Sequence, residues 1–160
     1  MIDVKSSAFD GVLFYYRYIE KNASTITEHI DSFNKYSKYR ILKWNILWGK
    51  IPIFEKLNSK FIIFHYSIPP EDYHKQYWIN ESIKSSKDIF KLIFFQDEYH
   101  YCNERFAFIN KFNINTIYSC VPKVSLKNIY GRNTIAKALH ESLTGYVDDS
   151  LIDSANTLRK

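Results

Sequence analysis

The amino-acid sequence predicts a Rossmann-like α/β domain, with a mostly parallel sheet of about five strands and helices on both faces. Two observations predict this class. Four short apolar runs, rich in β-branched and aromatic residues, are spaced along the chain, and segments with helical periodicity lie between them. The intervals are also long enough for the crossovers that parallel strands need. The four runs are residues 12–16, 61–64, 92–95 and 116–121.

The polarity of these runs indicates how the strands pair. They are continuously apolar rather than alternating, which is typical of strands covered on both faces, as in parallel sheets. Each run is also too short for a helix. Residues 40–46 form a weaker strand candidate, and residues 134–139 fit either a last strand or a helical turn.

The first helix is predicted to begin near Thr25. Thr25 and Glu28 have the spacing of a capping box, in which each side chain bonds a free backbone N–H of the first turn. Ile26, Ile30 and Phe33 then fall on one helical face. That face is expected to pack against the sheet.

Three further helices are predicted. One begins at residue 69, where two prolines are followed by two acidic residues, and continues to residue 83. Another places Cys102, Phe106 and Ile109 on one face. A short fourth helix spans residues 125–130 and ends at a glycine. Strands alternating with helices in this order favour right-handed βαβ units.

The length of 160 residues suits one domain, and a chain that is 46% hydrophobic and 18% aromatic has a globular composition. We expect an irregular arm at residues 1–10, the folded domain at residues 11–147 and a polar tail or linker at residues 148–160. The net charge of +5 mildly favours anionic partners, although surplus surface lysine explains it as well.

The predicted location is the cytoplasm. Cys102 and Cys120 lack the spacing of a zinc site, and we interpret both as reduced thiols. The chain begins without the pattern of a signal peptide, and no apolar run approaches the roughly 18 residues that a membrane span needs. Any membrane contact is therefore expected to be peripheral, at the inner face of the membrane.

Several familiar ligand motifs are absent from the sequence. No GxGxxG follows the first strand and no P-loop is present, which argues against NAD, FAD or ATP as the ligand of this domain. A GxSxG nucleophile elbow and an HExxH zinc motif are also absent. We therefore expect no cofactor and no metal. A specific nucleic-acid partner is not expected either, because only the basic balance and the aromatic content favour one.

Polar residues follow the predicted strands. In an open parallel sheet, ligands bind in the crevice beyond the carboxyl ends of the strands, so these residues are predicted to converge on one edge. The predicted substrate-binding residues are Asn22, Ser24, Thr25, Tyr66, Ser67, Gln96, Glu98, Tyr99, Thr144, Gly145 and Tyr146.

Asp97 and His65 are the candidates for a general base at this edge. A carboxylate can accept a proton there, and histidine titrates near neutral pH. Each residue also has a structural alternative. Asp97 directly before a helix could be its N-cap, and His65 could be a partly buried histidine whose nitrogens are satisfied. Gly145 likewise more often marks a turn than a ligand contact.

Five stretches of the chain carry a resemblance to a known family. They are TITEHIDSF at residues 25–33, IFHYS at 63–67, FFQDEY at 94–99, YSCVP at 118–122 and LTGYV at 143–147. In this order they resemble the N-terminal domain of bacterial glycosyltransferases of surface-polysaccharide synthesis. The resemblance covers roughly residues 12–150. The region 132–142, where the family has a strand, is ambiguous in this sequence.

The resemblance implies one half of a two-lobed enzyme of the kind called GT-B. The N-terminal lobe would bind a glycan or lipid-linked acceptor, and a missing C-terminal lobe would bind the nucleotide-sugar. An inverting enzyme would also need a general base. The isolated domain is then expected to be inactive. The alternative is a stand-alone, non-enzymatic α/β module for interaction or regulation.

Overall fold

The computed structural model describes residues 9–16, 24–49, 58–69 and 88–142. The predicted arm, the predicted helix after residue 69 and the predicted tail lie outside these ranges, apart from their boundary residues. The strands are β1 (Gly11–Tyr15), β2 (Ile41–Asn45), β3 (Phe61–Phe64), β4 (Phe90–Phe94), β5 (Thr116–Ser119) and β6 (Ala138–Glu141). The helices are α1 (Ser24–Tyr36), the 3-10 helix η1 (Ile46–Trp48), α3 (Cys102–Phe112) and α4 (Lys123–Ile129).

The described strands form one six-stranded sheet in the order β2-β1-β3-β4-β5-β6, and every neighbouring pair is parallel. The predicted α/β class with a parallel sheet is therefore confirmed, with six strands rather than about five. The weak candidate at residues 40–46 is β2. The ambiguous region is a strand, β6, which begins at Ala138.

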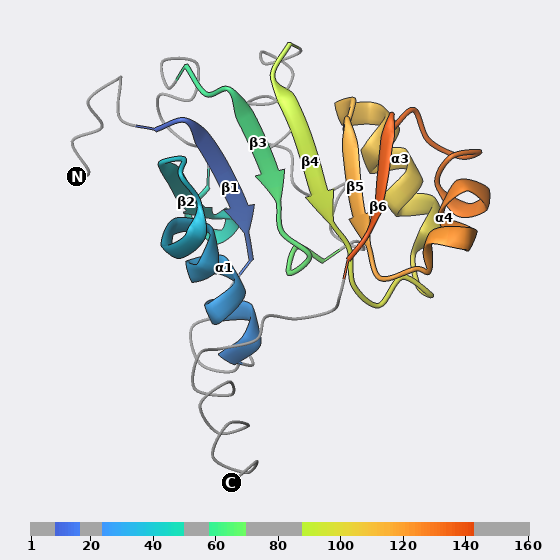
Figure 1. The fold of residues 1–160 in the computed structure, drawn as a ribbon, viewed down its shortest axis with the longest axis horizontal. Coiled ribbons are helices and arrows are strands. Elements are labelled where there is room, and N and C mark those ends of the chain that lie inside the picture. The colour runs from blue at the N-terminus through green and yellow to red at the C-terminus, as the bar shows by residue number, and fades with distance from the viewer. Residues whose placement is uncertain (1–8, 17–23, 50–57, 70–87, 143–160) are drawn as a thin grey trace, which may run out of the picture.

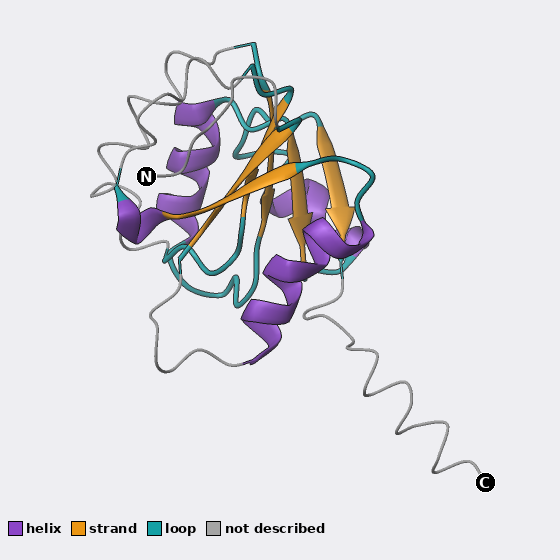
Figure 2. Cartoon of the chain, turned by 90° about the vertical axis from the view of Figure 1, so that its left-hand side faces the viewer, coloured by secondary structure: helices purple, strands orange, loops and turns teal. Residues whose placement is uncertain are grey.

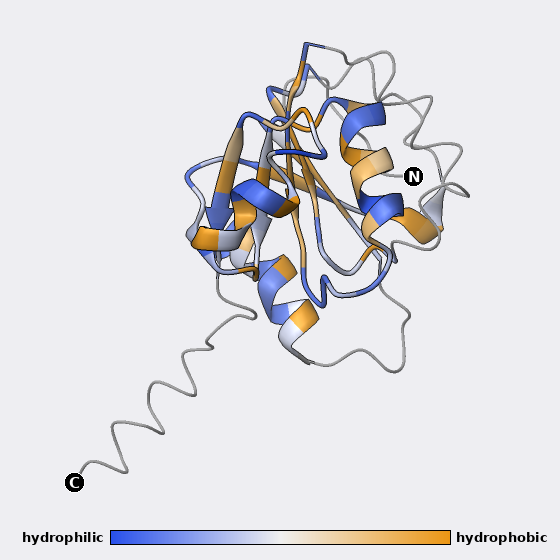
Figure 3. Cartoon of the chain, turned by 90° about the vertical axis from the view of Figure 1, so that its right-hand side faces the viewer, coloured by the Kyte–Doolittle hydropathy of each residue, from blue (hydrophilic) through white to orange (hydrophobic). Residues whose placement is uncertain are grey.

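Helices cover both faces of the sheet, as predicted (Figure 2). On one face, Ile30 of α1 packs with Leu13, Ile41 and Ile63 of the first three strands. The opposite face carries the larger core, in which α3 and α4 cover β1, β3, β4 and β5. The central strands are largely hydrophobic, whereas the helices carry both hydrophobic and hydrophilic residues (Figure 3).

The buried face of α3 includes part of the predicted stripe. Ile109 is buried and Phe106 packs against the core, whereas Cys102 is only partly buried. The stripe did not include Arg105, which is buried, because periodicity assigns a charged residue to solvent. The stripe of α1 through Ile30 is confirmed by its packing against the sheet.

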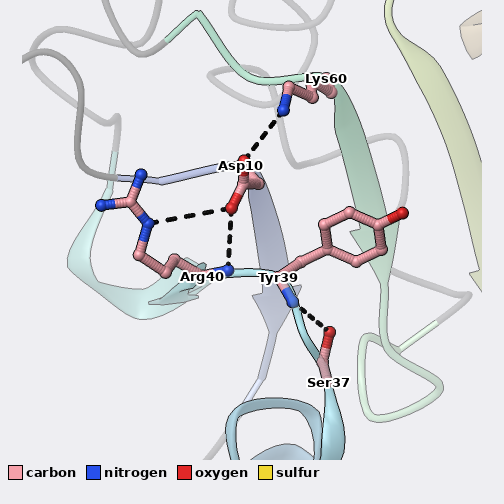
Figure 4. Close-up of polar contacts among 5 residues, drawn as sticks. All are labelled: Asp10, Ser37, Tyr39, Arg40 and Lys60. Atoms are coloured by element: carbon pink, nitrogen blue, oxygen red, sulfur yellow. Dashed lines mark hydrogen bonds and ion pairs between the residues drawn. The ribbon is translucent and has the colours of Figure 1, made fainter.

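Asp10 ties together the amino ends of the first three strands (Figure 4). Its carboxylate accepts hydrogen bonds from the backbone N–H of Arg40, at 3.0 Å, and from Nζ of Lys60, at 3.1 Å. These bonds lower the pKa of Asp10, the backbone N–H of Arg40 having the largest effect. Beside it, Gly11 pairs with Phe61, and a Cβ at Gly11 would lie 2.1 Å from the Phe61 ring. The glycine thus permits this close pairing of β1 and β3.

Both cysteines are free thiols. In the part of the chain that the structure describes, no helix has the length and apolar character of a membrane span.

Candidate functional site

The strand order places a switch point between β1 and β3. The chain leaves β1 toward β2 on one side and returns across β1 to form β3 on the other. The connections that leave β1 and β3 therefore diverge, and ligands of open parallel sheets bind in the crevice that opens at such a point. The arrowheads of β1, β3, β4 and β5 in Figure 1 all point toward this edge of the sheet.

Ser67 joins the ends of β1 and β3 at the switch point. Its Oγ accepts a hydrogen bond from the backbone N–H of Tyr16, at 3.0 Å. The backbone N–H of Ser67 donates to Nδ1 of His65, also at 3.0 Å, and Ser67 Oγ lies 2.8 Å from the same nitrogen. A nitrogen that accepts from a backbone N–H is unprotonated, so the Ser67 hydroxyl must donate to it as well.

The hydrogen bonds continue from His65 to α1. Nδ1 of His65 is unprotonated, so its proton is on Nε2, which lies 3.0 Å from Nδ1 of His29 and donates to it. His29 stacks on the Tyr66 ring at 5.4 Å and meets Phe94 edge-on at 5.5 Å. It lies one residue before Ile30 on α1, so the turn that buries Ile30 against the sheet also brings His29 to the strand ends.

Neither histidine carries a charge at neutral pH. Burial lowers the pKa of His65 well below its usual value, and the neighbouring His29 lowers it further. Burial also lowers the pKa of His29. With only 1% of its surface exposed and both ring nitrogens bonded, His65 is not placed to take a proton from a ligand. It instead sets the orientation of the Ser67 hydroxyl.

Arg105 is hydrogen-bonded to the backbone of the loop between β4 and α3. Its Nε donates to the carbonyl of His100 at 3.1 Å, and its Nη2 donates to the carbonyls of Gln96 at 3.3 Å and Asp97 at 3.2 Å. The guanidinium lies 4.9 Å from the centre of the Phe95 ring. These contacts support two left-handed residues in the loop, Asp97 at φ 53° and Tyr101 at φ 56°. Such a backbone is unusual for a bulky residue like tyrosine.

Glu98 fastens the same loop to β5 and α4. Its carboxylate accepts hydrogen bonds from the Ser119 hydroxyl at 2.7 and 2.8 Å, from the backbone N–H of Cys120 at 2.8 Å and from the Tyr130 hydroxyl. Burial, followed by the Glu98 charge, raises the pKa of Tyr130, so the phenol stays protonated and donates. Both oxygens of Glu98 are thus occupied by the protein.

Cys120 is not an activated nucleophile. Burial raises the pKa of its thiol, and the nearby carboxylates of Glu98 and Asp97 raise it further. Its Sγ lies 3.4 Å from the carbonyl of Phe95 and donates to it. Because the thiolate is the reactive form of cysteine, this setting opposes covalent chemistry at Cys120.

A pocket of about 300 Å³ lies between these loops, and we call it the edge pocket. Its lining residues come from α1, from the turn after β3, and from the loop and helix after β4. They are Ile26, Tyr66, Ser67, Gln96, Asp97, His100, Tyr101 and Arg105.

Four of the predicted site residues line the edge pocket: Tyr66, Ser67, Gln96 and Asp97. Three others are placed elsewhere. His65 lies behind Ser67, the carboxylate of Glu98 is bonded to β5 and α4, and the side chain of Tyr99 is 75% exposed to solvent. Thr25 is exposed at the start of α1 and is not among the lining residues. Ser24 opens α1. Asn22, Thr144, Gly145 and Tyr146 lie outside the described residues.

The N-cap alternative for Asp97 is wrong. Helix α3 begins at Cys102, and its N-cap is Tyr101, four residues after Asp97. The carboxylate of Asp97 is therefore not required at the helix start. Asp97 is exposed and lines the edge pocket.

Sequence reasoning missed His29, His100, Tyr101 and Arg105. His29 lies within the stretch 25–33 that carries the family resemblance. Its position next to Ile30, on the apolar face of the predicted helix, could have indicated that it lies close to the sheet. Arg105 gave no such signal, because an arginine in an amphipathic helix is normally placed on the solvent face.

Another pocket, an apolar one of about 340 Å³, lies near the amino ends of β3 and β4. It is lined by Phe33, Ser37, Tyr39, Ile41, Phe61, Ile63, Phe90 and Leu92. None of these side chains is charged. Within the described ranges no group of three or more His, Cys, Asp or Glu residues could hold a metal ion.

Comparison of the chain with protein-family models, with curated proteins and with the solved structures found no significant match.

Proposed function

We propose that this domain is the acceptor-binding half of a glycosyltransferase that moves a sugar from a nucleotide-sugar to a glycan or lipid-linked acceptor. The observation that carries the proposal is the edge pocket. Residues with a carboxylate, an amide and a hydroxyl side chain (Asp97, Gln96 and Ser67) line it together with Tyr66 and Tyr101. Pockets of this kind, apolar walls with a few convergent polar groups, bind small ligands in a fixed orientation.

The polar groups of the pocket suit a ligand with several hydroxyls. Ser67 gives its proton to His65 and accepts the backbone N–H of Tyr16, so one lone pair of its oxygen remains to accept a hydrogen bond from a ligand. The carboxylate of Asp97 is likewise an acceptor only. Two neighbouring acceptors favour a ligand that donates hydrogen bonds, as sugar hydroxyls do. Burial raises the pKa of Tyr66, so its phenol remains a donor for a ligand oxygen.

Asp97 is the better candidate for the general base. Its side chain is exposed and lines the edge pocket, whereas both nitrogens of His65 are bonded within the protein. A base must lie within hydrogen-bond reach of the proton that it removes. In this proposal Asp97 accepts the proton of the attacking acceptor hydroxyl, and His65 is a positioning residue that acts through Ser67.

The nucleotide-sugar would be bound mainly by a second, C-terminal lobe. The sequence has no P-loop or GxGxxG motif to hold a diphosphate. Transfer needs both reactants held together, which can supply roughly 7–11 kcal/mol of the barrier reduction. The proposed setting is the cytoplasm, with peripheral contact at the inner face of the membrane where a lipid-linked acceptor would be presented.

Calorimetry on residues 1–160 tests the proposal. We expect oligosaccharide or short polyprenyl-linked sugar acceptors to bind, nucleotide-sugars to bind weakly or not at all, and no turnover of the two together. Asp97→Asn should weaken acceptor binding about tenfold, the cost of one charge-assisted hydrogen bond. Asp31→Asn is the matched control, because Asp31 is exposed on α1 and bonded to Lys43.

Two results would contradict the proposal. Robust turnover by the chain alone would show that the domain holds a complete active site. No binding of any acceptor, with the fold intact, would favour the alternative of a non-enzymatic interaction or regulatory module.

A further inference from the structure

Arg105 is a buried cation that has no acidic partner among the described residues. Only 5% of its surface is exposed, and it takes part in none of the ion pairs among the described residues. Arginine stays charged in proteins, so burial cannot remove its charge as it can for lysine. A buried charge is costly unless it is paired and hydrogen-bonded. The three backbone carbonyls that it bonds satisfy hydrogen bonds but carry no net charge.

The hydrogen bonds of Arg105 leave one nitrogen unused. Nε and Nη2 donate to three carbonyls, which accounts for three of the five N–H groups of a guanidinium. Nη1 donates to no atom of the described residues. Nη1 also keeps some exposed surface. Among the described residues, Ser59 Oγ is the only side-chain nitrogen or oxygen that is both fully buried and without a partner, so the unpartnered Nη1 is not fully buried. Arg105 lines the edge pocket, so the free N–H groups open into it.

The surroundings add to the positive potential at this point. Helix α3 spans 11 residues and begins at the pocket, with Tyr101 as N-cap and no side-chain cap bond. The free N–H groups and the dipole of a helix start both favour an anion. The carboxylate of Asp97 lines the same pocket but forms no ion pair with Arg105. The edge pocket thus presents a cation and an anion to its ligand, unpaired with each other.

We propose that Arg105 binds an anionic group on the acceptor sugar, a carboxylate or a phosphate. The inference rests on the proposed function and names the substrate class: an acidic sugar or a sugar phosphate, rather than a neutral sugar. The anionic group bonds Nη1 of Arg105, and a hydroxyl of the same sugar donates to Asp97. One ligand then satisfies both charges of the pocket.

Titrations of residues 1–160 with matched ligands test the inference. Glucuronate and glucose 1-phosphate carry the two anions on one sugar frame, and methyl glucoside is the neutral control. At least one acidic sugar should bind about tenfold more tightly than the neutral one, and added salt should reduce that advantage. Which of the two binds better identifies the anion as carboxylate or phosphate.

Variants locate the binding to Arg105. Arg105→Gln should abolish the preference for the acidic sugar while the circular dichroism spectrum stays that of the folded protein. Because the same side chain holds the loop, this variant could unfold, so Asp97→Asn with inorganic phosphate is the second test. Removing the neighbouring negative charge should tighten phosphate binding several-fold, whereas Asp31→Asn should leave it unchanged.

The outcomes separate this inference from the proposed function. Equal binding of neutral and acidic sugars would overturn the inference and leave the acceptor pocket standing. Phosphate that binds as tightly as glucose 1-phosphate, with no contribution from the sugar, would support the anion site and contradict the acceptor assignment. Phosphate binding that is the same in Asp97→Asn as in the unaltered chain would overturn the anion site.

Discussion

At the scale of single residues, the protonation state of His65 affects both the hydrogen bonds of the site and the stability of the fold. Its ring accepts at Nδ1 and donates at Nε2, a pattern that only the neutral imidazole can provide. Protonation would turn Nδ1 into a donor facing the N–H of Ser67. It would also place a buried charge beside His29, which is why the pKa of His65 is so far below its usual value.

Stability should therefore fall as the pH drops through the ordinary histidine range. The folded-state pKa of His65 is depressed, so below about pH 6.5 the unfolded chain binds a proton that the folded chain does not. The free energy of unfolding should decrease by up to about 1.4 kcal/mol for each pH unit below that point. Urea titrations from pH 7.5 to pH 5 measure the slope.

His65→Gln supplies the comparison, because glutamine keeps polar atoms at this position and does not titrate. Its stability should change less with pH over the same range, whatever its absolute value. A wild-type slope that the variant fully retains would show that His65 is not the group responsible.

At the scale of elements, the loop between β4 and α3 forms one wall of the edge pocket and is held by side-chain hydrogen bonds. Arg105 bonds the backbone of the loop, and Glu98 bonds the loop to the ends of β5 and α4. Arg105 bonds the loop carbonyls through Nε and Nη2, and both carboxylate oxygens of Glu98 accept bonds from outside the loop. These bonds surround the left-handed residues Asp97 and Tyr101. Rigid placement of polar groups is what a binding pocket needs, because ordering them during binding would cost affinity.

Glu98→Gln tests whether Glu98 is a fastening rather than a ligand-binding residue. An amide has one acceptor oxygen where the carboxylate has two, so a donor among Ser119, Cys120 and Tyr130 loses its partner. We expect a loss of about 1–3 kcal/mol in the free energy of unfolding, and faster amide hydrogen exchange in residues 96–101. Tyr130→Phe removes one donor only and should cost less. Unchanged stability and exchange in Glu98→Gln would contradict this role.

Some elements could be predicted from the sequence because a local pattern determined them. The apolar runs identified β1, β3, β4 and β5, because short and continuous apolar runs are typical of strands covered on both faces. Strand β6 could not be separated from a helical turn, because its four residues are at most half-buried and carry a weak apolar signal. The burial of Arg105 on α3 was not predicted, because this side chain is held inside by backbone carbonyls that the hydrophobic periodicity of the sequence does not indicate.

At the scale of the whole molecule, the parallel sheet explains how residues distant in sequence meet. All strands end at one edge, so the turns after β3 and β4 meet there, although about 30 residues separate Ser67 from Asp97 in the chain. This convergence follows from parallel pairing alone and could be predicted. Which side chains face the pocket and which face the protein could not, because that depends on the hydrogen bonds of His65, Glu98 and Arg105.

The central claim is that the edge pocket binds the acceptor sugar, and mapping amide chemical shifts by NMR during a titration tests it most directly. With an acidic sugar such as glucuronate or glucose 1-phosphate, the largest shifts should fall on residues 66–67 and 96–101 and on Ile26 of α1. Tyr39, Phe61 and Phe90, which line the apolar pocket at the other end of the sheet, should not shift. Saturable shifts that cluster at the apolar pocket, with residues 96–101 unmoved, would contradict the account.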